Sequence, residues 1–135
     1  ISGIWWLREL IVSKEVKELF ESEKLTGCEF WPVIKHKKNI PFDDIFQLKI
    51  MGEMPCMDEK TDIDFETEIM YEGIKMKSCP FGCGQLQNVT DFALTQEWFG
   101  INSDYWRIPF VSAKVYHLIL NNRIKGVKFY LPTLV

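Results

Sequence analysis

Two cysteines on a short loop that contains glycine are the residues of this sequence best suited to chemistry. They stand in the run Cys79-Pro80-Phe81-Gly82-Cys83-Gly84. Two thiolates on such a loop provide half of a structural zinc site, which needs four ligands in a tetrahedral array. Three residues separate the cysteines rather than the usual two, and the chain has no second pair of this kind. Two interpretations remain open: a structural zinc ion held by Cys79, Cys83 and Cys56, or free thiols in a decayed zinc loop.

Other candidates for metal binding or catalysis are few. Cys28 or His36 is the distant fourth ligand that a zinc site would need. His36 stands in a basic run, where a solvated imidazole is expected, and His117 falls at the edge of the apolar stripe of an expected helix. The sequence contains no nucleophile elbow, glycine-rich phosphate loop or His-Glu-x-x-His motif. We therefore expect no catalytic residues and no enzyme, and the reduced thiols indicate the cytoplasm.

Charged residues are distributed unevenly. Residues 58–72 contain seven acids and one base, whereas residues 105–135 contain five bases and no acid. Residues 62–70 alternate between polar and apolar, as a strand does, and four carboxylates occupy the outward positions: Asp62, Asp64, Glu66 and Glu68. This row is either a solvated face, a docking surface for a basic protein partner, or a weak cation site. The net charge of −3 argues against a nucleic-acid partner, and no apolar run reaches the roughly 18 residues of a membrane span.

An internal repeat organises the elements that would position these residues. At an offset of 99 residues (112 minus 13), residues 8–30 and 107–129 share seven identities. Ser13 and Ser112 each precede a helical pattern, where a serine oxygen can accept a bond from the first turn. Gly27 and Gly126 follow each pattern, where a left-handed residue closes a helix. We expect helices near 13–25 and 112–124, followed by strands at 28–33 and 127–131, although two unrelated helix–turn–strand segments would give the same pattern.

The middle of the chain is predicted to be mostly β-strand. Residues 45–51 alternate, which places Phe46, Leu48 and Ile50 on one face, and residues 51–61 and 79–90 read as loops. We expect the five tryptophans to lie in the core or in interfaces. The chain is thus predicted to be one α+β domain over 1–135, with central, mostly antiparallel strands. A duplicated strand–helix–strand unit, 8–31 and 107–130, would stand at the two ends.

The order of motifs resembles that of the bacterial double-CxxCG motif proteins. The run Leu10-Ile11-Val12-Ser13 and the later run Leu25-Thr26-Gly27-Cys28-Glu29-Phe30-Trp31-Pro32-Val33 resemble one segment of that family. The loop at 79–84 stands where the family has its second CPxCG. The C-terminal stretch from Asp104 to Phe129 resembles the family's last segment. Two departures are the extra residue in the second cysteine pair and the missing first CxxCG.

That resemblance implies a function. The family is similar to immunity proteins of bacterial polymorphic-toxin systems, which implies a cytosolic protein that binds and blocks a cognate toxin. The alternative is a zinc-stabilised regulatory or adaptor protein, which would need four ligands. An enzyme would require a clustered set of groups with perturbed pKa values, and the sequence shows none.

Overall fold

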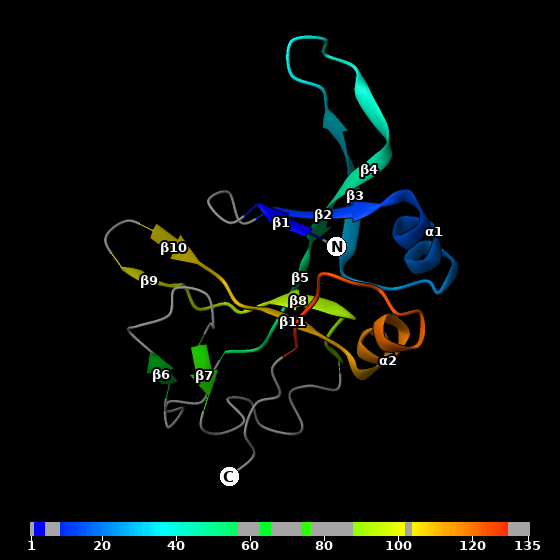
Figure 1. The fold of residues 1–135 in the computed structure, drawn as a ribbon. Helices are drawn as coiled ribbons and strands as arrows, with labels where there is room; N and C mark the ends of the chain where they lie inside the picture. Colours follow the sequence, from blue (N-terminus) through cyan, green and yellow to red (C-terminus); the bar gives the residue numbers. More distant parts are fainter. Residues whose placement is uncertain are drawn as a thin grey trace.

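A computed structural model describes residues 2–4, 9–56, 63–65, 74–76, 88–101 and 104–129 (Figure 1). A four-stranded antiparallel sheet runs in the order β1-β2-β4-β3, from β1 (Ser2–Ile4), β2 (Glu9–Ser13), β3 (Cys28–Ile34) and β4 (Pro41–Ile50). A second sheet runs in the order β11-β8-β5, from β5 (Gly52–Glu53), β8 (Phe92–Leu94) and β11 (Pro109–Val111). Within it, β5 and β8 are parallel. The predicted α+β domain with mostly antiparallel strands is confirmed.

Two further pairs of strands are antiparallel hairpins. β6 (Ile63–Phe65) pairs with β7 (Ile74–Met76), and β9 (Phe99–Ile101) pairs with β10 (Asp104–Trp106). Residues 52–53, predicted to belong to a loop, form β5 because β4 leads through Met51 directly to the edge of β8. The stretch from β4 to β5 thereby joins the two larger sheets.

The two helices begin in the same way. They are α1 (Lys14–Ser22) and α2 (Ala113–Asn121). The Ser13 hydroxyl accepts from the Val16 N–H at 3.4 Å, and the Ser112 hydroxyl accepts from the Val115 N–H at 3.3 Å. These bonds satisfy one unpaired donor of each first turn. Both predicted helices and both serine caps are confirmed.

The helices also end in the same way, but not at the predicted residues. Lys24 and Arg123 close them, each with a φ of +52°. The amide of the next residue then reaches back five positions: Leu25 N–H bonds to Phe20 O at 3.2 Å, and Ile124 N–H bonds to Ile119 O at 3.1 Å. This is the Schellman arrangement with a lysine or an arginine in the left-handed position. The prediction that glycines close the helices is therefore wrong.

Gly27 and Gly126 do have positive φ, +77° and +85°, but three residues beyond each closing residue. At Gly27 the reason is a close approach of two backbones. A Cβ there would collide with the carbonyl oxygen of Phe92 and with Thr90, and one at Gly52 would meet the same two residues. The Gly27 carbonyl also accepts from Met51 N–H at 2.8 Å. Glycine is required here by packing between segments.

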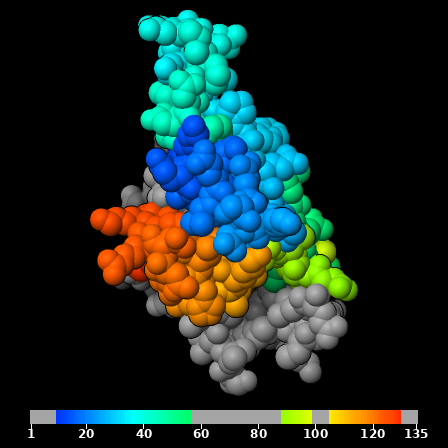
Figure 2. All heavy atoms as spheres, turned by 90° about the vertical axis from the view of Figure 1, so that its right-hand side faces the viewer, coloured from blue at the N-terminus to red at the C-terminus, as the bar shows by residue number. Residues whose placement is uncertain are grey.

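One apolar core serves both helices. It contains residues from α1, from α2 and from strands of both larger sheets: Val12, Val16, Phe20, Leu48, Phe92, Val115 and Ile119. In Figure 2, α1 (blue) and α2 (orange) lie next to each other on one face. The predicted inward row of β4 is confirmed, because Phe46 and Ile50 pack against this core beside Leu48.

The predicted second copy of the strand after the helix is not found. Residues 127–129 have no strand structure, and 130–131 lie outside the described residues. Val127 and Phe129 pack on the core with their side chains, and the Phe129 ring lies 5.0 Å from that of Tyr116. After α1, by contrast, Cys28–Ile34 is a strand because β4 supplies its hydrogen-bond partner. The strand and capped helix recur, but a duplicated strand–helix–strand unit is not established.

The outer part of the β3–β4 hairpin projects from the body (Figures 1 and 2). We call residues 31–45 the arm. None of these residues belongs to either apolar cluster of the described chain. The strand register shifts between Pro32 and Ile34, which pair with Phe46 and Pro41. Between these two pairs, β3 has one residue and β4 has four. Beyond this shift the hairpin leaves the core that α1 covers.

Candidate interaction surface

The arm carries three large apolar side chains exposed to solvent. The exposed fractions are 45% for Trp31, 47% for Ile34 and 52% for Ile40. Trp31 points outward because Cys28 and Phe30 of the same strand pack inward and side chains of a strand alternate. Ile34 and Ile40 flank the turn, where Lys35 N–H bonds to Ile40 O at 2.8 Å. Exposed large apolar side chains on a projecting element are typical of a binding surface.

Trp31 is held in one orientation by its neighbours. Its indole N–H donates to the Glu29 carboxylate at 3.1 Å, and the Lys49 ammonium lies 5.1 Å from the ring centre. Glu29 and Lys49 are cross-strand partners in the β3–β4 register. A fixed aromatic side chain loses little rotational entropy when it binds. The geometry thus gives the arm a pre-oriented anchor.

Asp91 fixes the body from which the arm extends. Its Oδ2 accepts from the Thr26 N–H at 2.9 Å and the Thr26 hydroxyl at 3.1 Å, and its Oδ1 accepts from the Ser112 hydroxyl at 2.7 Å. Desolvation is the largest influence on the pKa of Asp91 and raises it, but these bonds and nearby Lys114 outweigh it, so the pKa is lowered. Lys114 also donates to Glu23 O at 2.7 Å. The end of α1 and the start of α2 are thus joined by polar contacts.

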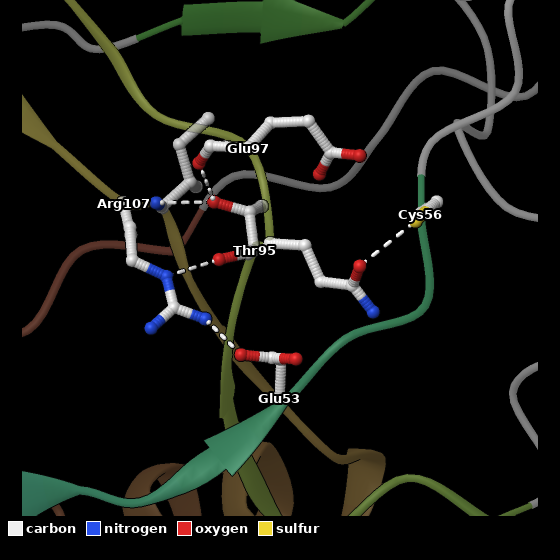
Figure 3. Close-up of polar contacts among 7 residues, drawn as sticks. Glu53, Cys56, Thr95, Glu97 and Arg107 are labelled. Atoms are coloured by element: carbon white, nitrogen blue, oxygen red, sulfur yellow. Dashed lines mark hydrogen bonds and ion pairs between the residues drawn. The ribbon is translucent and has the colours of Figure 1, made fainter.

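A second polar cluster surrounds Thr95, which is fully buried (Figure 3). The Thr95 hydroxyl donates to Glu97 O and accepts from Ile108 N–H, both at 2.9 Å. Arg107 donates from Nε to Thr95 O and from Nη2 to the Glu53 carboxylate, the latter at 2.8 Å. The guanidinium carbon also lies 5.8 Å from the centre of the exposed Trp98 ring. The hydroxyl proton of Thr95 is engaged by a carbonyl, so this cluster stabilises the β8–β11 region and is not a nucleophile with its base.

Of the predicted zinc ligands, the structure places Cys56 only. Cys79 and Cys83 lie outside the described residues, and Cys56 is exposed with its thiol 2.8 Å from Gln96 Oε1. Within the described ranges, no group of three or more His, Cys, Asp or Glu side chains is arranged to hold a metal ion. The zinc site therefore stays a prediction.

The two residues considered for a distant fourth ligand lie at opposite ends of β3. Cys28 begins that strand, whereas His36 is exposed in the turn beyond it. Partial burial, with the charges of Asp91 and Glu21, raises the pKa of the Cys28 thiol to about 11. Metal ligation needs a thiolate, so the surroundings of Cys28 favour an inert thiol.

The predicted acidic strand is described only over its centre. β6 contains Asp64, whose backbone pairs in register with Lys75 of β7. Asp62, Glu66 and Glu68 lie outside the described residues. The docking role of this strand stays a prediction.

The sequence interpretation did not single out the arm, although the sequence contains a signal for it. Residues 35–38 form a basic run, and alternation through Cys28 and Phe30 places Trp31 on the opposite, outward face. Trp31 and Trp98 are 45% and 65% exposed, so of the two predicted locations the core is excluded for them, and an interface stays a prediction.

Comparisons with known proteins leave the resemblance as a hypothesis. No protein-family model matches the chain, and neither a curated protein nor a solved structure matches it. In the described part of the chain, no helix is long and apolar enough to cross a bilayer.

Proposed function

We propose that this chain is a non-catalytic binding protein that neutralises a cognate bacterial toxin by forming a stoichiometric complex, with the arm as the part that enters the partner. The observation that carries this proposal is Trp31, a large side chain that is exposed and yet fixed by Glu29 and Lys49. Tryptophans in such positions contribute a large share of the free energy in many protein interfaces. The toxin as the partner is supported by the sequence resemblance.

The fold supports this role because it connects the arm to a packed body. β4 runs from the arm into the core through Phe46, Leu48 and Ile50. On that inner face, Lys17 of α1 lies over the Phe46 ring at 5.1 Å and bonds to Glu21 at 2.8 Å. The base of the arm is therefore held on one side while its outer face stays open. The cysteine loop that favours the alternative, a zinc-stabilised adaptor, lies outside the described residues, so that alternative stays a prediction.

The test is binding to the product of the neighbouring gene. An inactivated form of that product should form a 1:1 complex with this chain in calorimetric titration and gel filtration. Co-expression of this chain with the active form should restore growth. A chain that forms no complex with that product, or that turns over a substrate by itself, would contradict the proposal.

A further inference from the structure

The tip of the arm has a charge opposite to that of the chain as a whole. Residues 34–42 contain three lysines and a histidine but no acid, in a chain with a net charge of −3. His36, Lys37 and Lys38 are exposed. The nearest acids along the chain beyond the tip are Asp43 and Asp44, which lie on β4.

The backbone that carries these cations is held in place by hydrogen bonds of the turn. Lys38 N–H bonds to Lys35 O at 3.3 Å, and Lys37 and Asn39 have φ values of +68° and +51°. Lys35 lies over the Phe42 ring at 5.1 Å. A turn that is closed by backbone bonds fixes the places from which its lysine side chains extend, which favours a partner whose negative charges lie opposite the tip.

From these observations we infer that the arm binds a protein surface that consists of an apolar pocket bordered by carboxylates. The pocket takes Trp31, and the carboxylates face Lys37 and Lys38 at the tip. This inference rests on the proposed function and adds the chemistry of the partner. It combines two independent features of the arm, the exposed anchor and the cationic tip, which lie on the same projecting hairpin.

A protein fits the arm better than a membrane does. A hairpin that inserts into a bilayer places its apolar side chains foremost, whereas here the foremost residues 35–39 are all polar. Ile34, Ile40 and Trp31 lie behind them. Insertion of these side chains would first require desolvation of the lysines, which is costly.

A protein also fits better than a nucleic acid. Single-stranded nucleic acids are bound by several aromatic side chains on which successive bases stack, whereas the arm has one exposed tryptophan, and the Lys49 ammonium lies over one face of its ring. The net negative charge of the chain further disfavours a polyanion. The predicted acidic segment at 58–72 has the opposite sign and would meet a different part of the partner.

Charge reversal at the tip tests the inference. Lys37→Glu/Lys38→Glu should slow association with the inactivated neighbouring-gene product by about tenfold at low salt and weaken its salt dependence, because charges at an interface rim act mainly on the association rate. The neutral variant Lys37→Gln/Lys38→Gln should associate at a rate between those of the unchanged chain and the charge-reversal variant. The matched control is Lys14→Glu/Lys24→Glu at the two ends of α1, in which Lys24, like Lys37, has a positive φ. Thermal unfolding verifies that each variant is folded.

The outcomes separate this inference from the proposed function. An unchanged association rate in the charge-reversal variant, with a complex still formed, would overturn the inference and leave the proposed function intact. The absence of any complex would overturn both. Binding to phosphatidylglycerol vesicles or to duplex DNA that is lost on charge reversal, with partner binding unaffected, would overturn the inference in favour of a lipid or nucleic-acid ligand.

Discussion

The Ser112 hydroxyl donates a hydrogen bond to Oδ1 of Asp91 at 2.7 Å, while it caps α2 by accepting from Val115 N–H at 3.3 Å. Its counterpart in the first helix, Ser13, accepts from Val16 N–H at 3.4 Å. Asp91 also accepts from Thr26, in the loop after α1. One carboxylate thus ties the start of α2 to the loop that ends the first helical segment.

The two serine caps should therefore differ in their contribution to stability. Ser13→Ala should lower the free energy of unfolding by about 1 kcal/mol, the usual value for a capping serine. Ser112→Ala should lower it by about 2 kcal/mol, because the bond to Asp91 is lost as well. Urea unfolding of the two variants measures both values. Equal losses would mean that the Ser112–Asp91 bond adds nothing.

Asp91 should make stability depend on acid pH. Its pKa in the folded chain is lowered, so the folded state binds fewer protons there than the unfolded state does. The resulting stabilisation is complete above the unfolded pKa of about 3.9 and is lost as pH falls through the folded pKa. Asp91→Asn should be less stable at neutral pH and should lose less of its stability between neutral and acid pH. A variant with the same acid slope as the unchanged chain would contradict this role.

Gly27 and Gly126 should respond differently to a methyl group. Gly27→Ala should lower the free energy of unfolding by about 3 kcal/mol or more, because a positive φ is combined with overlap onto Phe92 and Thr90. Gly126→Ala should cost about 1 kcal/mol from its backbone conformation. Chemical denaturation compares the two. Similar small losses would show that the approach of the two backbones at Gly27 is not tight.

The described cysteines should differ in reactivity. The pKa of Cys28 is raised to about 11 and its side chain is partly buried, so only a small fraction of the Cys28 thiols is ionised at pH 8. At that pH Cys28 should react with an aromatic disulfide reagent at least about tenfold more slowly than the exposed Cys56. A thiolate of high pKa is the stronger nucleophile, but this offsets only part of the effect of the small ionised fraction. The comparison uses two triple serine variants, each retaining one of these cysteines. Equal rates would contradict the buried position of Cys28.

Local signals were enough to predict the helices. Ser13 and Ser112 cap them through residues three positions away, and Val16 and Val115 face the core as their spacing predicts. These interactions lie within one turn of chain, so sequence spacing determines them. The identity of the closing residue was missed because lysine and arginine rarely take a positive φ.

Contacts between distant segments were not predictable in the same way. Asp91 meets Thr26 across 65 residues, and no periodicity connects the two. The sequence shows that Gly27 follows a helix. The residue must be glycine, however, because the backbone of Phe92 comes too close for a Cβ atom. The arm is a similar case. The sequence shows a basic run and an alternation that turns Trp31 outward, but only the fold shows that the hairpin leaves the apolar core beyond Phe46.

The affinity of Trp31→Ala for the inactivated neighbouring-gene product tests the central claim most directly. Loss of a fixed aromatic anchor should cost about 2 kcal/mol or more of binding free energy, a rise in Kd of about thirtyfold, with 1:1 stoichiometry and the fold retained. Trp98→Ala is the matched control, because Trp98 is also exposed and directly precedes β9, which lies apart from the arm in Figure 1. The Kd of this variant should match that of the unchanged chain. A Trp31→Ala variant that binds as tightly as the unchanged chain would contradict the account.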